Sequence, residues 1–494
     1  MNLSILLILP FAFSLILLFV KGQKQVRTVA LAAATVQFVL SLVLLFQFIS
    51  ARAKSNTPFL FEENHAWFKQ LNINYHVGVD GIAVSMILLT AFVVLAGVLV
   101  SWKQEKLYKE FFFLLIFLSM GAYGFFISLD VFTMFFFLEV AVIPKFLLIG
   151  IWGSGKKEYS AMKLALMLMA GSGLVFVGLA GLYFNTGGAA SFDLLQLSSH
   201  NFTPAVQKLF FPFAFIGFGV FTALFPFHTW VPDGHSSAPT AASMFLAGIS
   251  MKLGGYGCLR VATYLMPDAA QYYAPVIIIL ASIAILYGAF ATMMQTDLKY
   301  INAYSSVSHT AFVILGIAML TRTSINGAVM QMISHGLMTA LFFAVIGMIY
   351  ERTHTRQVAQ LGGLLKVMPF ISSIFVIVGL CSLGLPGLSG FVAEMTIFMG
   401  SWERAGTFYH AATIIAAASI VVTAVYILRA VGSAIMGPMQ NNEHLQLSDA
   451  AWYEKTAAVL LMIGILVMGL APFWLTDLIN PGTEVIIQKI GMIK

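Results

Sequence analysis

Long runs of apolar residues dominate the chain, and short polar segments separate them. Fourteen runs are long enough to cross the roughly 30 Å hydrocarbon core of a bilayer as helices of about 20 residues. Strands of a membrane β-barrel would alternate apolar and polar positions, and these runs do not alternate. The pattern predicts an all-α polytopic membrane protein with about 14 transmembrane helices. The runs lie near residues 3–20, 28–49, 81–101, 111–128, 130–151, 164–186, 207–230, 239–265, 274–294, 301–319, 325–350, 368–399, 409–431 and 456–474.

Composition narrows the class further. Of 494 residues, 60% are hydrophobic and 9% are charged, whereas soluble proteins carry about a quarter charged residues. This excludes a soluble enzyme, a disordered scaffold and a nucleic-acid binder. Cys258 and Cys381 are the two cysteines, and both lie in apolar runs. Two cysteines exclude a disulfide framework and a cysteine-ligated iron–sulfur cluster.

Basic residues in short loops orient the chain. With the N-terminus outside, the inner loops carry 14 basic residues and the outer segments carry 7, which fits the excess of Lys and Arg in cytoplasmic loops. An even helix number then places both termini outside. The inner residues are Lys21, Lys24, Arg27, Lys103, Lys106, Lys109, Lys156, Lys157, Lys163, Lys299, Arg352, Arg356, Lys366 and Lys455, and the outer ones are Arg52, Lys54, Lys69, Arg322, Arg404, Lys489 and Lys494.

No linker or soluble domain interrupts the runs, so we predict one transmembrane domain over 1–494. It divides into N-terminal helices at 3–101, a first repeat at 111–265, a second repeat at 274–431, and a C-terminal helix and tail at 456–494. The one long outer segment, 51–80, contains Phe59, Phe61 and Trp67. We expect this segment to lie on the surface as a hairpin or lid.

Two of the predicted helices contain a proline at membrane depth. Pro226 lies in the seventh run, and Pro386 lies in the twelfth among Gly384, Gly387 and Gly390. Because proline removes a backbone donor, both helices should break there. Broken helices in corresponding positions of two halves are typical of inverted repeats that surround a transport site.

Five ionisable residues lie inside predicted helices or directly after a break: Glu139, Lys252, His309, His335 and Glu394. A charge at the bilayer centre costs about 2.5–3.5 kcal/mol or more, so such residues mark functional sites. At a rise of about 1.5 Å per residue, Glu139, Lys252 and both histidines lie within about 4 Å of their helix midpoints. Groups at one depth describe a proton path in the plane of the bilayer, since burial or intrinsic chemistry brings Glu, Lys and His near the working pH range.

Structural interpretations of the same residues remain open. The two histidines could be hydrogen-bonded packing residues, and Glu139 and Lys252 could form a static ion pair that fixes helix packing. Glu394 could be a cap at the helix break.

The sequence carries no motif for a bound cofactor. It has no phosphate-binding loop of the form G-x-x-x-x-G-K-[ST] and no dinucleotide-binding fingerprint. His228, Asp233 and His235 cluster near the end of the seventh run, but this segment offers too few ligands for zinc. We therefore expect no metal and no cofactor in this chain.

The stretch HTWVPDGHSSAPTAASMFLAGISMKLGGYGCLR, residues 228–260, resembles the antiporter-like M subunits of respiratory complex I, which are related to Mrp-type antiporter subunits. Further matches to this family are TDLKYINAYSSVSH, MISHGL with YERTHTR, and LGLPGLSGFVAE, in the same order along the chain. The resemblance covers essentially the whole chain and is strongest from about 110 to 400.

The resemblance implies a proton-translocating membrane-arm subunit of an NADH:quinone oxidoreductase in a bacterial cytoplasmic membrane, or in an organellar one. It implies no redox centre in this chain. NADH, FMN, iron–sulfur clusters and quinone would belong to partner subunits, and neighbouring antiporter-like chains would be direct partners. Glu139 matches the family's gating glutamate, Lys252 the central lysine, His309 and His335 the polar connection, and Glu394 the exit group.

One position departs from the family. Its members carry a lysine in helix seven, seven residues before the first histidine of H-x-W, and this chain has Phe221 there. Lys145 is a possible ion-pair partner for Glu139 in its place. A six-residue spacing puts the two on different faces of a straight helix, but Pro144 can distort the helix. Alternatively, the long stem of Lys145 carries its ammonium towards the inner interface.

Three other functions stay open at this point. The chain could belong to an Mrp-type cation/proton antiporter, to the membrane part of a hydrogenase-like complex, or to a purely structural scaffold. Exchange of Na⁺ for protons without NADH would favour the antiporter, and neighbouring hydrogenase genes would favour the second. Pumping that survives Glu139→Gln and Lys252→Ala would favour a scaffold.

Overall fold

The computed structural model describes residues 1–55, 57–187 and 190–491, and most of them lie in helices. Lys494, one of the outward charges, and the end of the predicted tail lie outside the described residues. The helices are α1 (Ile5–Phe19), α2 (Gln23–Arg52), α3 (Gly81–Val100), α4 (Tyr108–Ile127), α5 (Val131–Val140), α6 (Val142–Trp152), α7 (Lys157–Phe184), α8 (Leu194–Ser199), α9 (Pro204–Phe221), α10 (Trp230–Ser237), α11 (Thr240–Phe245), α12 (Met251–Gly257), α13 (Pro267–Met293), α14 (Leu298–Ala318), α15 (Arg322–Thr353), α16 (Pro369–Ser382), α17 (Ser389–Glu403), α18 (Thr407–Ala430), α19 (Trp452–Leu470) and α20 (Phe473–Gly491).

Shorter elements complete the fold. The strands β1 (Leu60–Phe68) and β2 (Ile73–Val79) form an antiparallel hairpin. Three segments have π-helical turns, namely η3 (Leu246–Ser250), η4 (Cys258–Thr263) and η7 (Val431–Met436). Four are short 3-10 turns, namely η1 (Lys69–Leu71), η5 (Val358–Gln360), η6 (Leu364–Lys366) and η8 (Asn442–Gln446).

All fourteen predicted runs are helical in the part of the chain that the structure describes. Eleven of the helical spans, with α5 and α6 taken as one, are long and apolar enough to cross a membrane. The other three runs are the 15-residue helix α1, the segment α11–η4 with its π turns, and the interrupted pair α16 and α17. Length and composition thus support eleven crossings directly, and the count of fourteen is not confirmed.

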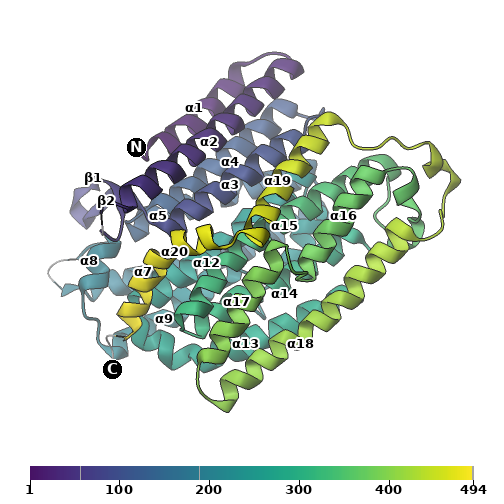
Figure 1. Ribbon diagram of the computed structural model, residues 1–494. Helices are drawn as coiled ribbons and strands as arrows, with labels where there is room; N and C mark the ends of the chain where they lie inside the picture. Colours follow the sequence, from purple (N-terminus) through teal and green to yellow (C-terminus); the bar gives the residue numbers. More distant parts are fainter. Residues whose placement is uncertain (56, 188–189, 492–494) are drawn as a thin grey trace.

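The long helices run side by side, and both chain ends lie at the same side of the bundle (Figure 1). The N-terminus contacts the hairpin there, because the backbone N–H of Leu3 donates to Glu63 at 3.1 Å. The end of α20 is tied to the same side, since Lys489 donates to the carbonyl of Ser198 at 2.6 Å. We call this side the terminal face. The opposite side, which carries the loops with most of the basic residues, is called the basic face.

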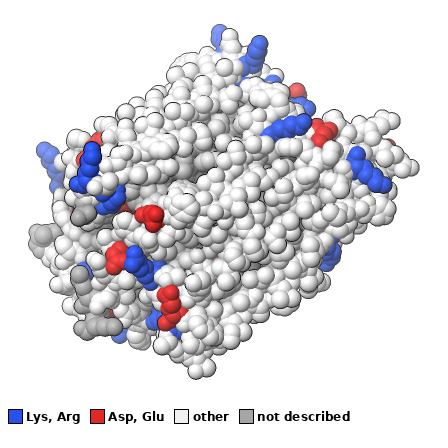
Figure 2. Space-filling model, in the orientation of Figure 1, with Lys and Arg blue, Asp and Glu red and all other residues white. Residues whose placement is uncertain are grey.

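Charged side chains gather near these two faces, and a broad uncharged band lies between them (Figure 2). Large apolar side chains are exposed in this band, among them Leu166, Val421 and Leu428. An exposed apolar belt of this kind is the surface that faces hydrocarbon in a membrane-spanning protein.

Three helices are interrupted inside the band. The predicted seventh helix ends with α9 and resumes at α10, with Pro226 in the connection, and the twelfth is split into α16 and α17 around Pro386. Gly384 and Gly387 have positive φ angles of 76° and 92°, which glycine adopts without steric cost. The fifth helix, predicted as continuous, breaks at Ala141 because Pro144 has no N–H to donate to the preceding turn.

The eighth predicted helix is continuous in outline but not regular. Residues of α12 lie between the π turns of η3 and η4, and Lys252 is the second residue of α12. Turns of this kind are rare and frequently accompany functional sites. Lys252 therefore stands on a short α-helical stretch between two π-helical turns.

Two predictions for the terminal face can be compared with the structure. Within the segment 51–80, residues 60–79 form the predicted hairpin, with Leu60 opposite Val79 and Ala66 opposite Asn74. The predicted C-terminal tail is instead the helix α20, because apolar residues at helical spacing give it a buried stripe. These residues are Leu475, Leu478, Ile479, Ile486 and Ile490.

Candidate functional site

Four of the five predicted ionisable residues come together in the core of the bundle. The ammonium nitrogen of Lys252 lies 2.7 Å from Nδ1 of His335, and it also donates to the carbonyl of Ala247. Both side chains are only 1% exposed. The lysine comes from α12 and the histidine from α15, so the contact joins two helices.

The second half of the cluster continues from His335. Its ring and that of His309 on α14 lie 5.7 Å apart between centroids. His309 then contacts Glu394 of α17, with 3.1 Å between Nδ1 and Oε1, and its Nε2 lies 3.1 Å from the hydroxyl of Ser382. We call Lys252, His335, His309 and Glu394 the polar row. It runs from the eighth helix to the broken twelfth helix, and all four side chains are buried.

This geometry argues against two of the structural interpretations, the Glu139–Lys252 ion pair and the Glu394 cap. Lys252 pairs with His335, and among the described residues it forms no ion pair with Glu139. The static Glu139–Lys252 pair is therefore wrong for this structure. The carboxylate of Glu394 contacts His309 rather than a free backbone N–H at the start of α17, so the contact favours a role in the row over a cap.

The row has an extension that sequence reasoning missed. Lys299, assigned to an inner loop, is buried at the start of α14, and its ammonium donates to the carbonyl of Ala238 at 2.7 Å. His235 on α10 lies within electrostatic range of both Lys252 and Lys299. Its two ring nitrogens have no hydrogen-bond partner among the described residues. Asp297, two residues before Lys299, caps α14 and pairs with Arg356 at 3.1 Å.

Glu139 lies apart from the row, at the end of α5, and is partly exposed. One of its carboxylate oxygens is buried with no hydrogen-bond partner in the described chain. Lys145, on α6 beyond the break at Ala141, is 1% exposed and its ammonium also lacks a partner there. The two charges are in electrostatic range of each other without direct contact.

The ammonium of Lys145 lies 5.9 Å from the centre of the Phe221 ring, at the last residue of α9. The side chain thus points into the bundle, towards the break in the seventh helix. The alternative in which Lys145 reaches the inner interface does not fit this position, because the residue is fully buried.

The residues around the seventh-helix break hold that break in place. The ring of His228 stacks on Phe225 at 5.5 Å and lies 4.9 Å from the ring of Tyr287. Asp233 forms a partly exposed ion pair with Lys163 at 2.7 Å. Within the described ranges, no three His, Cys, Asp or Glu side chains come close enough to hold a metal ion.

A buried ion pair lies between the polar row and the terminal face. Arg260, two turns beyond Lys252, pairs with Asp80, and both side chains are 1% exposed. Asp80 also caps α3 by accepting from the N–H of Ala83 at 2.9 Å. In sequence Asp80 is indistinguishable from an ordinary helix cap, so its buried partner could not be predicted.

The hairpin is attached to the bundle by a titratable contact on the terminal face. His76 of β2 contacts Asp193, and its Nε2 lies 3.5 Å from Glu62. Burial alone would lower the pKa of His76, but the hydrogen bond and charge of Asp193, together with Glu62, outweigh burial and raise the pKa. For Asp193, burial acts to raise the pKa, but the hydrogen bonds from His76 and from backbone N–H groups lower it.

Comparisons with known proteins agree with this architecture. Residues 128–423 match a family model described as NADH:quinone oxidoreductase/Mrp antiporter, transmembrane. The chain is 34% identical to NADH-quinone oxidoreductase subunit M of Rickettsia bellii, over 98% of each chain. It is 39% identical to NAD(P)H-quinone oxidoreductase chain 4-2 of Synechocystis sp., over 77% of this chain and 67% of the relative.

A solved structure shares the fold. A chain in the structure of respiratory complex I from Thermus thermophilus with bound NADH superposes with a TM-score of 0.90 at 24% identity, covering 99% of this chain and 100% of that one.

Proposed function

The chain belongs to the NADH:quinone oxidoreductase/Mrp antiporter transmembrane family, and we propose that it is a proton-translocating subunit in the membrane arm of an NADH:quinone oxidoreductase. The observation that carries the proposal is the polar row, which crosses the bundle from Lys252 to Glu394 at membrane depth. Several buried ionisable groups in contact are costly in a bilayer and are typical of proton relays.

The two hydrogen-bonded contacts of the row correspond to proton transfers between named atoms. The 2.7 Å contact lets the ammonium of Lys252 give its proton to Nδ1 of His335. Nε2 of His335 has no partner among the described residues, so this nitrogen passes the proton on towards His309, whose ring centre is 5.7 Å away. His309 delivers the proton to Glu394 over 3.1 Å.

The supply of protons to Lys252 comes from the basic face. Lys299 and His235 are buried between that face and Lys252. An imidazole with two unpartnered nitrogens accepts a proton on one and releases it from the other. Under the positive-inside rule the basic face is cytoplasmic, so protons enter the row from the cytoplasm of a bacterial cell, or from the matrix of an organelle.

Glu139 and Lys145 form the gate of this chain. Their electrostatic attraction links the charge on α5 to the cation that lies beside the seventh-helix break. When Glu139 is protonated, Lys145 loses its attraction to α5, and the net electrostatic field at the connection between α9 and α10 changes. Lys145 thereby serves in place of the lysine that other family members carry at the position of Phe221.

The chain supplies the path, and other subunits supply the energy. NADH, FMN, iron–sulfur clusters and quinone belong to partner subunits in this proposal, and neighbouring antiporter-like subunits flank this chain in the lipid bilayer. The partly exposed Glu139 lies at the surface of the chain, where a neighbouring subunit can alter its charge.

Reconstituted vesicles test the assignment. We expect NADH oxidation by the complete complex to acidify the lumen when the basic face points outward, independently of Na⁺. Acidification that requires a Na⁺ gradient and proceeds without NADH would contradict the proposal and support an Mrp-type antiporter.

A further inference from the structure

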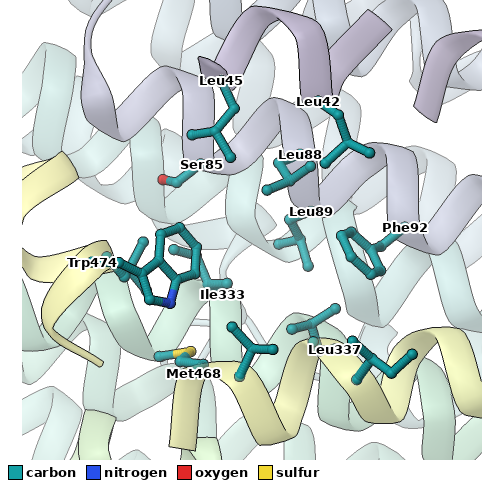
Figure 3. Close-up of a pocket in the computed structure, with 14 residues that line it drawn as sticks. Leu42, Leu45, Ser85, Leu88, Leu89, Phe92, Ile333, Leu337, Met468 and Trp474 are labelled. Atoms are coloured by element: carbon teal, nitrogen blue, oxygen red, sulfur yellow. The ribbon is translucent and has the colours of Figure 1, made fainter. Parts of the chain in front are cut away.

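An apolar cavity of about 280 Å³ opens at the side of the bundle between α2 and α19 (Figure 3). Its inner wall is formed by α3 and α15, where Leu89 and Leu337 are buried. Its mouth is formed by Leu42 of α2 and by Ile463 and Val467 of α19, which are 50% and 44% exposed. The mouth therefore lies on the apolar belt that faces hydrocarbon.

The chemistry of the wall excludes water as the occupant. Ser85 and Trp474 carry the side-chain hydrogen-bond donors of the lining. The hydroxyl of Ser85 is already engaged, because it donates to the carbonyl of Ile82 at 2.7 Å. The indole N–H of Trp474 has no partner among the described residues, so it offers a water one contact. A buried water needs two to four polar partners, and apolar cavities of comparable size stay dry and take up apolar molecules.

The positions of the lining residues along α3 place the cavity in one leaflet of the bilayer. Ser85 and Phe92, which both line it, lie about 6 Å and about 16 Å along α3 from its start at the terminal face. The cavity thus extends about 10 Å along the bilayer normal, within the leaflet on the side of the terminal face. A partner helix does not fit, since 10 Å of helix about 10 Å wide would fill on the order of 800 Å³.

A positively charged residue lies on the same helix as part of the mouth, nearer to the terminal face. Arg52 lies seven residues after Leu45, which lines the cavity, so it is on the same side of α2 and about 10 Å nearer to the terminal face. Its guanidinium donates to the carbonyls of Thr57 and Pro58, just beyond the end of α2. A guanidinium has five donors and favours phosphate.

We propose that this cavity binds one acyl chain of a phospholipid from the leaflet at the terminal face, with the lipid phosphate at Arg52. The acyl chain fills the space between α2 and α19 and packs against Leu89 and Leu337. The proposal concerns a lipid site and does not depend on the role of the chain in proton transfer.

Photo-crosslinking tests the site in the full chain embedded in nanodiscs of phosphatidylglycerol, a fraction of which carries a diazirine in one acyl chain. We expect labels on Leu89 and Leu337, which are 2% and 4% exposed and which bulk lipid does not reach. Labels confined to exposed belt residues such as Leu470 would overturn the proposal.

Three variants refine the test. Leu42→Trp fills the mouth and should reduce labelling of the inner wall at least fivefold. Leu428→Trp, an equal substitution at an exposed position of α18, should leave labelling unchanged. Arg52→Gln should reduce labelling severalfold, and undiminished labelling of Leu89 and Leu337 in Leu42→Trp or in Arg52→Gln would contradict the site or its headgroup contact.

Discussion

Removal of the Lys145 ammonium isolates its contribution to the gate. Six residues separate it from Glu139, which corresponds to about 9 Å along the helix axis. If this rise is taken as the separation of the two charges, they attract each other by about 2 kcal/mol at an effective dielectric constant of about 20. Lys145→Met therefore shifts the balance between charged and neutral Glu139 by about 20-fold towards the neutral form. If the gate acts through the charged form, proton pumping should fall by up to that factor.

The assay is proton uptake into proteoliposomes that contain the complete complex, recorded with a pH-sensitive dye beside NADH oxidation. Phe221→Lys added to Lys145→Met should restore pumping, because the Lys145 ammonium lies 5.9 Å from the Phe221 ring. Lys208→Met removes another lysine that lies over an aromatic ring, 4.0 Å from Tyr272, and should have no effect. Unchanged pumping in Lys145→Met, or no recovery in the double variant, would refute the reasoning.

Three further predictions follow from other contacts. His309→Leu removes both ring nitrogens from the path to Glu394, so pumping should fall at least 10-fold, and normal pumping would contradict the row. Gly81→Ala puts a methyl carbon 1.7 Å from a backbone oxygen of α20, so the free energy of unfolding should fall by about 1–3 kcal/mol in denaturant titrations. Gly173→Ala adds a methyl group with no atom within 4 Å, and it should raise the free energy of unfolding by about 0.5–1 kcal/mol. Because the pKa of His76 is raised in the folded protein, its contact with Asp193 is fully stabilising below about pH 6.5 and is lost as the pH rises through the raised pKa. Hydrogen exchange in the hairpin, corrected for intrinsic rates, should therefore increase above neutral pH. His76→Gln should abolish that increase.

The fold could be predicted from the sequence wherever one apolar run makes one helix. The breaks in the seventh and twelfth helices could also be predicted from the sequence, because Pro226 and Pro386 remove backbone donors whatever surrounds them. The predicted C-terminal tail was wrong, since α20 is held by packing against α3 and α15 rather than by a long apolar run. The break at Ala141 was foreseen only as a distortion by Pro144, because the effect of a proline on helix direction depends on its neighbours.

The candidate site was predictable as a set of residues but not as a set of contacts. Depth along each helix indicated that Lys252, His309 and His335 share a level. The pairing of Lys252 with His335 instead of Glu139 depends on which helix faces pack together, and single-sequence periodicity does not give that. Lys299 was missed because a lysine near a helix end is usually solvated, and only the surrounding structure shows that it is buried.

The central claim is that protons pass through this chain by way of Lys252. Its most direct test is the number of protons translocated per NADH oxidised by the reconstituted complex with Lys252→Met, compared with Lys366→Met at an exposed lysine on the basic face. The account predicts a lower quotient in Lys252→Met and the wild-type quotient in Lys366→Met. A wild-type quotient in Lys252→Met, at an unchanged rate of NADH oxidation, would contradict it.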